Sequence, residues 1–406
     1  MPALPVVTPA GVVLKSSGPA AAPRVDHAGP ALAAERVELL DVLRGLMALA
    51  VAVYHLSIWT HAVQGAARNG IVLLGIYSVE GFFVISGFCM FHLYRGARFE
   101  PRSFYIKRFF RIAPLYYVAM TVALSGVCAH AGIPSTAFTW PRLIGNLTLS
   151  FGLFHPNHAL VLGGWSIGIE FVFYLILPLL LWLTKRWAIL YLLLVLAIGC
   201  AIPFSFGRIQ AAEEARRFHV YVLIPNQVFL FLAGAAIADL RSRTSWRLPL
   251  LQVLGTLGVM LWLAASTQPP FSDHLDVMVG WARVKYVLLC VFAVASCAFC
   301  ARTRPRFVQP LTRLGDLSYS VYLMHPAAWA AVALLLPPAT SSMTRLICGV
   351  VATLGLASVT QRFIEKPAIA CGRNLCKKLG ARPRLVSTGA VPSQTSAERG
   401  VAFTLR

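Results

Sequence analysis

The chain has 406 residues, of which 58% are hydrophobic and only 13% charged, and its mean hydropathy is +0.70. Water-soluble domains do not combine so little charge with so much apolar surface, so the composition indicates a protein that crosses a membrane several times. The net charge of +21 is also typical of nucleic-acid-binding proteins. The distribution of the charges along the chain decides between these two classes.

Stretches of about 20 mostly apolar residues recur, which is the length a helix needs to cross a hydrocarbon core about 30 Å thick. We therefore predict an all-α integral membrane protein with a bundle of about ten transmembrane helices. The predicted spans are residues 40–60, 70–93, 112–130, 163–184, 187–205, 220–240, 249–266, 282–301, 315–336 and 343–363. Between the third and fourth spans, the segment NLTLSFGLF predicts a short re-entrant or interfacial piece within residues 131–162.

The basic residues predict the orientation of this bundle. If the N-terminus is cytoplasmic, 28 of the 36 Lys and Arg residues fall on the cytoplasmic side, as the positive-inside rule requires. Both termini are then cytoplasmic. The same asymmetry accounts for the positive charge, so we predict no nucleic-acid partner.

The two ends of the chain differ in composition from the bundle. Residues 1–34 are rich in proline and alanine and have no signal-peptide pattern, which predicts a disordered cytoplasmic tail. Residues 35–370 form the predicted transmembrane domain. Residues 371–406 include CKKLGARPR and predict a basic cytoplasmic tail whose first part rests on anionic lipid.

Ionisable side chains inside the spans are the first candidates for function, because each costs a few kcal/mol on membrane-insertion scales. At about 1.5 Å of rise per residue, His55 lies about 8 Å below the outer surface, Glu80 about 12 Å and Glu170 about 10 Å. A histidine and two carboxylates in one layer suit a general base with an orienting anion. The alternative for each residue is a polar contact that only joins two helices.

Three arginines and a second histidine extend this pattern. Arg44 and His55 are eleven residues apart, so they share a helix face about 16 Å long. Arg108 and Arg111 lie at the inner end of the third span, where arginines can bind phosphates or serve as ordinary topology anchors. In the ninth span, His325 is either a second site residue or a helix-to-helix hydrogen bond, and its isolation favours the second.

Several aromatic and hydroxyl side chains complete the candidate site. Trp165 and Tyr174 flank Glu170, and the tryptophans near the outer face serve either as membrane anchors or as stacking surfaces for a sugar. Ser86, Tyr174 and Tyr322 are candidate donors to a developing oxyanion. Cys297 and Cys300 form a single CxxC without nearby histidines, so we predict no metal site.

Taken in order, six sequence blocks resemble the membrane-bound acyltransferase-3 family, the bacterial sugar O-acyltransferases. The blocks are Arg44-x10-His55, EGFFVISGF (80–88), RFFRIAPLYY (108–117), WSIGIEFVFYLILP (165–178), LGDLSYSVYLMHP (314–326) and FIEKP (363–367). They span residues 36 to 367, which is nearly all of the predicted domain. Glu80 stands where the family more often has Asp, and we expect no fused SGNH-type domain.

The resemblance implies a ten-helix enzyme of the bacterial inner membrane that transfers an acyl group, usually acetyl, from cytoplasmic acyl-CoA to a glycan hydroxyl. It implies that His55 is the catalytic base, that Arg44 is essential, and that Arg108 and Arg111 contact CoA. We expect Glu80 or Glu170 to orient His55, and Arg44 to join Arg108 and Arg111 in binding the phosphates of CoA. A direct transfer and a covalent acyl-histidine both remain open.

The acceptor remains open between an exopolysaccharide, an O-antigen, a lipo-oligosaccharide and a macrolide-type secondary metabolite. Two other classes are compatible with charges buried in a helical bundle: a glycan or lipid transporter and a non-catalytic membrane subunit. The sequence shows no internal repeat of the kind that many transporters have. It also retains His55 and Arg44, which a non-catalytic subunit would not need. The sequence does not predict an oligomeric state.

Overall fold

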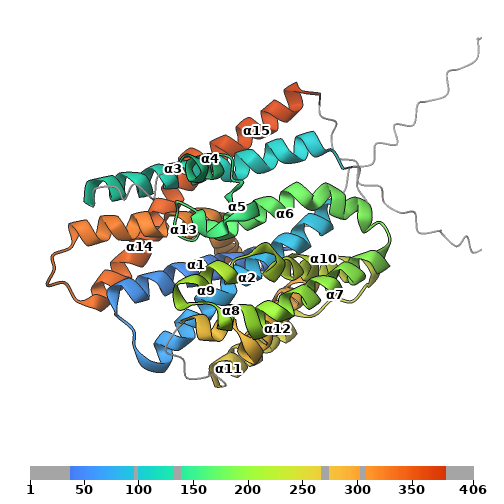
Figure 1. The fold of residues 1–406 in the computed structure, drawn as a ribbon, viewed down its shortest axis with the longest axis horizontal. Helices are drawn as coiled ribbons and strands as arrows, with labels where there is room; N and C mark the ends of the chain where they lie inside the picture. The colour runs from blue at the N-terminus through green and yellow to red at the C-terminus, as the bar shows by residue number, and fades with distance from the viewer. Residues whose placement is uncertain (1–36, 96–98, 131–138, 267–273, 302–307, 381–406) are drawn as a thin grey trace, which may run out of the picture.

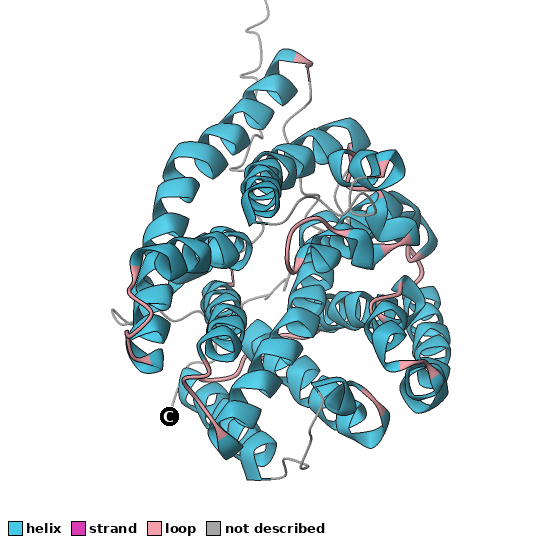
Figure 2. Cartoon of the chain, turned by 60° about the vertical axis from the view of Figure 1, so that its left-hand side comes forward, coloured by secondary structure: helices cyan, strands magenta, loops and turns pink. Residues whose placement is uncertain are grey.

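The computed structural model describes residues 37–95, 99–130, 139–266, 274–301 and 308–380. Over these residues the chain consists of helices and short connections, and a single isolated bridge between Leu248 and Cys300 is its only β-type pairing. Figure 2 shows helices running through the whole molecule with short loops between them. The predicted all-α class is confirmed.

Eleven long helices form the body of the described chain. They are α1 (Glu38–Thr60), α2 (Gly65–Tyr94), α3 (Pro101–His130), α6 (Gly164–Leu183), α7 (Trp187–Pro203), α10 (Val228–Arg243), α11 (Leu250–Ser266), α12 (Gly280–Phe299), α13 (Val308–Leu335), α14 (Ser342–Thr360) and α15 (Lys366–Lys378). The shorter pieces are α4 (Trp140–Leu147), α5 (Phe151–Phe154), η2 (Pro156–His158), η3 (Phe204–Arg208), α8 (Ile209–Ala211), α9 (Glu214–Tyr221), η4 (Ile224–Asn226), η5 (His274–Met278) and η6 (Gln361–Glu365).

Each of the ten predicted spans overlaps one of the long helices. Among the described residues, six helical stretches are long and apolar enough to cross a membrane, and they support a multi-pass membrane protein: Glu38–Thr60, Gly65–Tyr94, Gly164–Leu183, Trp187–Ala211, Gly280–Phe299 and Ser342–Lys378. The sixth predicted span, 220–240, is interrupted, because α9 ends at Tyr221 and α10 begins only at Val228. The count of ten crossings and the cytoplasmic termini stay predictions.

Glycines allow the central helices to approach closely, as is common where helices pack inside a membrane. A Cβ added to Gly45 of α1 would lie 2.6 Å from the backbone nitrogen of Gly315 in α13. A Cβ added to Gly87 of α2 would lie 1.9 Å from a backbone oxygen of α10, and one at Gly234 of α10 would meet α2 equally closely. The pairs α1–α13 and α2–α10 therefore form the tightly packed centre, with α1 and α2 crossing the middle of the view in Figure 1.

The segment predicted as re-entrant or interfacial forms α4, α5 and η2. Within it, α5 packs against α6, because Gly152 approaches Gly168 so closely that an added Cβ would lie 2.2 Å from its backbone. The buried ring of Phe151 stacks on that of Tyr116 in α3, with ring centroids 6.0 Å apart. This segment therefore fixes the start of α6, which carries several candidate residues.

The predicted tails are only partly within the described residues. The N-terminal tail, 1–34, lies outside them, as do residues 381–406. The predicted start of the C-terminal tail, residue 371, falls inside α15, which runs beside α3 in Figure 1. Cys376 is buried there, with its Sγ 3.7 Å from the backbone oxygen of Ser103. The first part of the predicted tail is thus a packed helix.

Candidate active site

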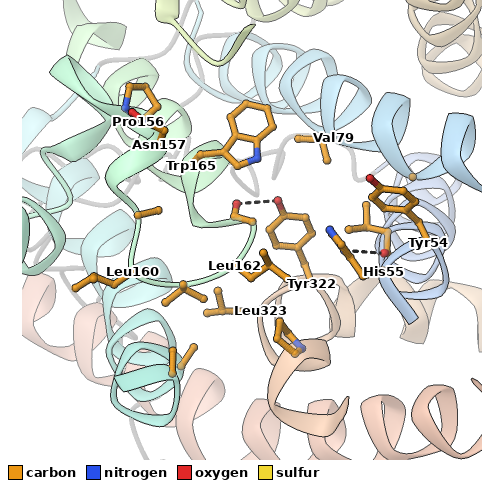
Figure 3. A pocket seen from close by; sticks show the side chains of 18 of the residues that line it. Tyr54, His55, Val79, Pro156, Asn157, Leu160, Leu162, Trp165, Tyr322 and Leu323 are labelled. Atoms are coloured by element: carbon orange, nitrogen blue, oxygen red, sulfur yellow. Dashed lines mark hydrogen bonds between the residues drawn. The ribbon is translucent and has the colours of Figure 1, made fainter. Parts of the chain in front are cut away.

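A cavity with a volume of about 810 Å³ contains His55 in its wall; we call it the His55 cavity. Helices α1, α2, α3, α6, α9 and α13 and the connection before α6 surround it. Most of its lining is apolar, and the polar side chains in it are Tyr54, His55, Asn157, Tyr221 and Tyr322. In Figure 3 the imidazole of His55 projects toward the space between Tyr322, Val79 and Trp165. A cavity of this size holds a ligand of drug or disaccharide size.

The His55 ring is held by contacts on two sides. Its Nδ1 lies 3.1 Å from the backbone oxygen of Val51 and 3.0 Å from Nε2 of His325. Its ring is stacked with that of Trp59, with centroids 5.5 Å apart, and with that of His325, with centroids 4.9 Å apart. His325 itself is fully buried in α13, and its Nδ1 lies 2.7 Å from the backbone oxygen of Tyr322. The predicted helix-to-helix contact of His325 is therefore made to the candidate base itself.

A second, smaller pocket of about 120 Å³ lies toward the other end of α1 and contains Arg44, Arg108 and Glu170; we call it the Arg108 pocket. Glu170 accepts hydrogen bonds from the hydroxyls of Ser86 at 3.0 Å and Tyr174 at 2.5 Å. The guanidinium of Arg108 lies over the Tyr174 ring, 5.1 Å from its centroid. The pocket thus places two cations and a hydrogen-bonded carboxylate around a narrow space.

The two spaces meet at Tyr322, which lines both of them. Its hydroxyl donates to the backbone oxygen of Gly163 at 2.9 Å, a bond drawn in Figure 3, and lies 2.8 Å from the hydroxyl of Ser166. Gly163 has φ of 75°, a left-handed conformation that favours glycine, and a Cβ there would lie 3.0 Å from the Tyr322 hydroxyl. This hydrogen-bonded contact forms the partition between the two spaces.

Glu80 lines neither the His55 cavity nor the Arg108 pocket, and it does not contact His55. It is buried, with its Oε1 accepting from the Tyr221 hydroxyl at 2.9 Å and lying 3.4 Å from Nη2 of Arg283. The prediction that Glu80 or Glu170 orients His55 is wrong, because Nδ1 of His55 contacts His325 and the backbone oxygen of Val51 instead. Depth along a span does not specify which helix face a residue occupies, and α2 begins five residues earlier than predicted.

The two arginines of the RFFR motif also lie in different surroundings. Arg108 lines the Arg108 pocket, whereas Arg111 forms an ion pair with the buried Glu365 and lies over the Tyr319 ring. Glu365 also accepts a hydrogen bond from Ser320 at 2.8 Å. It ends η6, a π-helical turn that interrupts the helix after α14. Arg111 therefore links α3 to η6 through this ion pair, and its surroundings do not resemble a ligand site.

Histidines that the sequence analysis did not single out lie beside the His55 cavity, at the end that the predicted topology places outside. Nδ1 of His219 in α9 lies 2.8 Å from the side-chain oxygen of Asn157, which lines the cavity. The rings of His155 and His158 stack, with centroids 4.6 Å apart. Burial lowers the pKa of His158, and the neighbouring His155 and Arg142 lower it further. These contacts hold η2 against α9 and close one side of the cavity.

Sequence reasoning also missed Ser166, although a signal for it was present. Ser166 precedes Glu170 by four residues, so both lie on one face of α6, and both line the Arg108 pocket. Among the residues that the structure describes, no group of three or more His, Cys, Asp or Glu side chains is placed to hold a metal ion. The functional groups that line the two spaces are histidine, hydroxyl, amide, carboxylate and guanidinium groups.

Comparison with known proteins identifies the type of enzyme to which this geometry belongs. The family model described as "Acyltransferase domain" (Acyl_transf_3) matches residues 37–362, which is most of the chain. The chain belongs to the acyltransferase-3 family. The match covers both the His55 cavity and the Arg108 pocket, and no solved structure matches the chain.

Curated relatives of this acyltransferase-3 protein include proteins named for peptidoglycan O-acetylation, for exopolysaccharide production and for acyl transfer. It is 25% identical over 360 residues to peptidoglycan O-acetyltransferase OatA of Listeria monocytogenes serovar 1/2a, an alignment covering 82% of this chain and 55% of OatA. It is 28% identical over 290 residues to exopolysaccharide production protein ExoZ of Rhizobium meliloti, covering 67% and 82%. It is 26% identical over 318 residues to acyltransferase MdmB of Streptomyces mycarofaciens, covering 71% and 78%. The chain thus spans about half the length of OatA and most of ExoZ and MdmB.

Proposed function

We propose that this protein is an inner-membrane O-acyltransferase that moves an acyl group, most simply acetyl, from acyl-CoA to a hydroxyl of a glycan. The observation that supports this most directly is the pair of spaces that meet at Tyr322: a cationic pocket on one side and a cavity with a histidine on the other. Two substrates can then approach the same point from opposite sides. The peptidoglycan and exopolysaccharide relatives support a glycan acceptor.

In this proposal the thioester end of the donor enters through the Arg108 pocket. A volume of about 120 Å³ is far below the roughly 300–1,000 Å³ of pockets that hold whole ligands, so the nucleotide end of CoA stays outside it. Arg44 and Arg108 line the entrance with permanent positive charge, which suits the phosphates and carbonyl oxygens of the donor. Arg111 is neutralised by Glu365 and contributes to the fold.

The acceptor hydroxyl binds in the His55 cavity, where His55 removes its proton as the oxygen attacks the thioester carbonyl carbon. The C–S bond then breaks, and the departing thiolate takes the proton from His55, so free CoA and the ester are formed. Thiolate is a good leaving group, so the main requirements are an activated hydroxyl and a donor to the oxyanion. The hydroxyls of Tyr322 and Ser166 lie at the junction of the two spaces, and the hydroxyl that turns its hydrogen from the Gly163 oxygen to the oxyanion supplies that donor.

The lining of the cavity supports a second type of acceptor. Valine, leucine, alanine, proline and aromatic side chains form most of the wall, and few polar groups point inward. A hydroxylated molecule with a large apolar surface, such as a lipid-linked saccharide or a macrocyclic metabolite, fits this wall better than a fully hydrated polysaccharide. The chemistry at His55 is the same for both types.

The test compares mass spectra of surface glycans and secreted metabolites from cells that express wild-type protein or His55→Ala. We expect an acyl-group mass increase that disappears in His55→Ala. The matched control is His61→Asn, because His61 is exposed at the end of the same helix and asparagine tolerates its φ of 51°. Acylation that persists in His55→Ala at equal expression would overturn the proposal.

A further inference from the structure

We propose that His325 is a positioning residue that fixes the tautomer of His55, so that the unprotonated Nε2 of His55 faces the acceptor. The inference rests on the proposed role of His55 as the base. No carboxylate contacts the His55 ring within the described structure, because Glu80 pairs with Arg283 and Glu170 accepts from Ser86 and Tyr174. Some other group must therefore set which ring nitrogen carries the proton.

The assignment begins at the buried end of the pair. Nδ1 of His325 lies 2.7 Å from the backbone oxygen of Tyr322. A carbonyl oxygen can only accept a hydrogen bond, so Nδ1 of His325 carries the hydrogen. In a neutral imidazole the second nitrogen is then an acceptor. Nε2 of His325 therefore offers a lone pair to its neighbour.

That neighbour is Nδ1 of His55, 3.0 Å away. Nδ1 of His55 also lies 3.1 Å from the backbone oxygen of Val51. Both partners are acceptors, so Nδ1 of His55 is the donor, and the lone pair of neutral His55 must be on Nε2. Figure 3 shows the His55 ring directed into the cavity, and this leaves its Nε2 available to an acceptor hydroxyl.

The backbone contact alone would hold His55 less firmly. The oxygen of Val51 is four residues earlier in α1 and already accepts the helical N–H of His55, so it is a shared acceptor. His325 is fully buried and anchored to its own backbone, so water does not compete for its Nε2. When His55 takes up a proton, the bond to His325 becomes charge-assisted and stronger, which stabilises the imidazolium.

Conservative substitutions separate this role from simple packing. Glutamine can place its side-chain oxygen near the position of Nε2 and accept from His55, whereas asparagine reaches only the position of Nδ1. We therefore expect His325→Gln to keep kcat within about 10-fold of wild type. We expect His325→Asn to lose about 100-fold or more in kcat with little change in KM, since a wrong tautomer in a catalytic triad costs up to ~10⁴-fold.

A double variant provides the second readout, with thermal stability in detergent confirming that each variant folds. If His325 acts only through His55, His55→Ala with His325→Asn loses no more activity than His55→Ala alone. Multiplied losses in the double variant, or wild-type kcat in His325→Asn, would contradict the positioning role. An equal loss in His325→Gln and His325→Asn would contradict it as well. Full activity of His55→Ala would instead overturn the proposed function, so the two failures are distinct.

Discussion

The hydroxyl of Tyr322 lies 2.8 Å from the hydroxyl of Ser166, and this contact forms the partition between the His55 cavity and the Arg108 pocket. Tyr322 comes from α13 and Ser166 from the first turn of α6, so the partition is made by two helices that are far apart in the sequence. Any thioester that enters beside Arg108 and reacts with a hydroxyl beside His55 must reach this point. In the proposed function, the two substrates meet at this contact.

Replacing Tyr322 with phenylalanine removes one hydroxyl and leaves the ring in place. We expect kcat to fall by about 10- to 100-fold, because loss of one oxyanion donor in an enzyme typically costs about 10²- to 10³-fold and Ser166 can compensate in part. Steady-state kinetics with acyl-CoA and a soluble acceptor analogue measure the change. Tyr105→Phe is the matched control, since its hydroxyl donates to the backbone oxygen of Leu175 and Tyr105 lines neither space. Equal losses in both variants would refute the role of Tyr322.

The two arginines of the RFFR motif should respond differently to substitution. We expect Arg108→Gln to raise the KM for acyl-CoA while the protein remains as stable as wild type, because Arg108 lines the pocket. We expect Arg111→Gln to lower the free energy of unfolding by about 3 kcal/mol, because it leaves the buried carboxylate of Glu365 without its cation. Acyl-CoA titration and thermal unfolding in detergent separate the two effects.

A compensating change tests the second half of this prediction. Arg111→Gln combined with Glu365→Gln removes both charges, so we expect the double variant to recover most of the lost stability. If Arg111→Gln weakens acyl-CoA binding without any effect on stability, Arg111 is a donor-binding residue as the family resemblance implies. In that case the assignment of Arg111 to the fold is incorrect.

The sequence predicted the helices of this protein better than it predicted which side chains meet. The apolar stretches located every long helix except α15, because about 20 apolar residues in a row have few other structural explanations. The break near Pro225 was missed, since hydropathy averaged over a span does not register one proline within it. The eleven-residue spacing predicted that Arg44 and His55 lie at the two ends of one helix face. In the structure both belong to α1, and they line different spaces.

The sequence did not indicate which helices contact one another. His55 and His325 are 270 residues apart, and neither periodicity nor depth indicates that their helices are neighbours. Glu80, Glu170 and His55 were grouped by estimated depth, but rotation about each helix axis sends Glu80 to Arg283 and Glu170 to Ser86. The family resemblance supplied the roles expected of Arg44 and His55, and the structure adds the partners of His55.

The predicted orientation of the bundle can be tested by cysteine labelling in intact cells. Glu213→Cys lies in the exposed connection before α9, which the topology places outside, and Lys378→Cys lies on the exposed face of α15, which it places inside. We expect a membrane-impermeant maleimide to label Glu213→Cys and to label Lys378→Cys only after the cells are broken. Wild-type protein controls for Cys200 and Cys371, which are exposed. Labelling of Lys378→Cys in intact cells would contradict the cytoplasmic C-terminus.

Substitution of the buried Glu80 distinguishes a catalytic role of its carboxylate from a structural one. In Glu80→Gln the amide oxygen still accepts from Tyr221, but the guanidinium of Arg283, only 2% exposed, loses its counter-charge. Since an unpaired buried charge costs about 3–5 kcal/mol, we expect a marked loss of thermal stability. We expect kcat per folded molecule to stay within about twofold of wild type, because Glu80 lines neither space. Glu80→Asp, which keeps the charge, is the control and should recover part of the stability. A stable Glu80→Gln protein with a large loss of kcat would instead place Glu80 in the catalytic machinery.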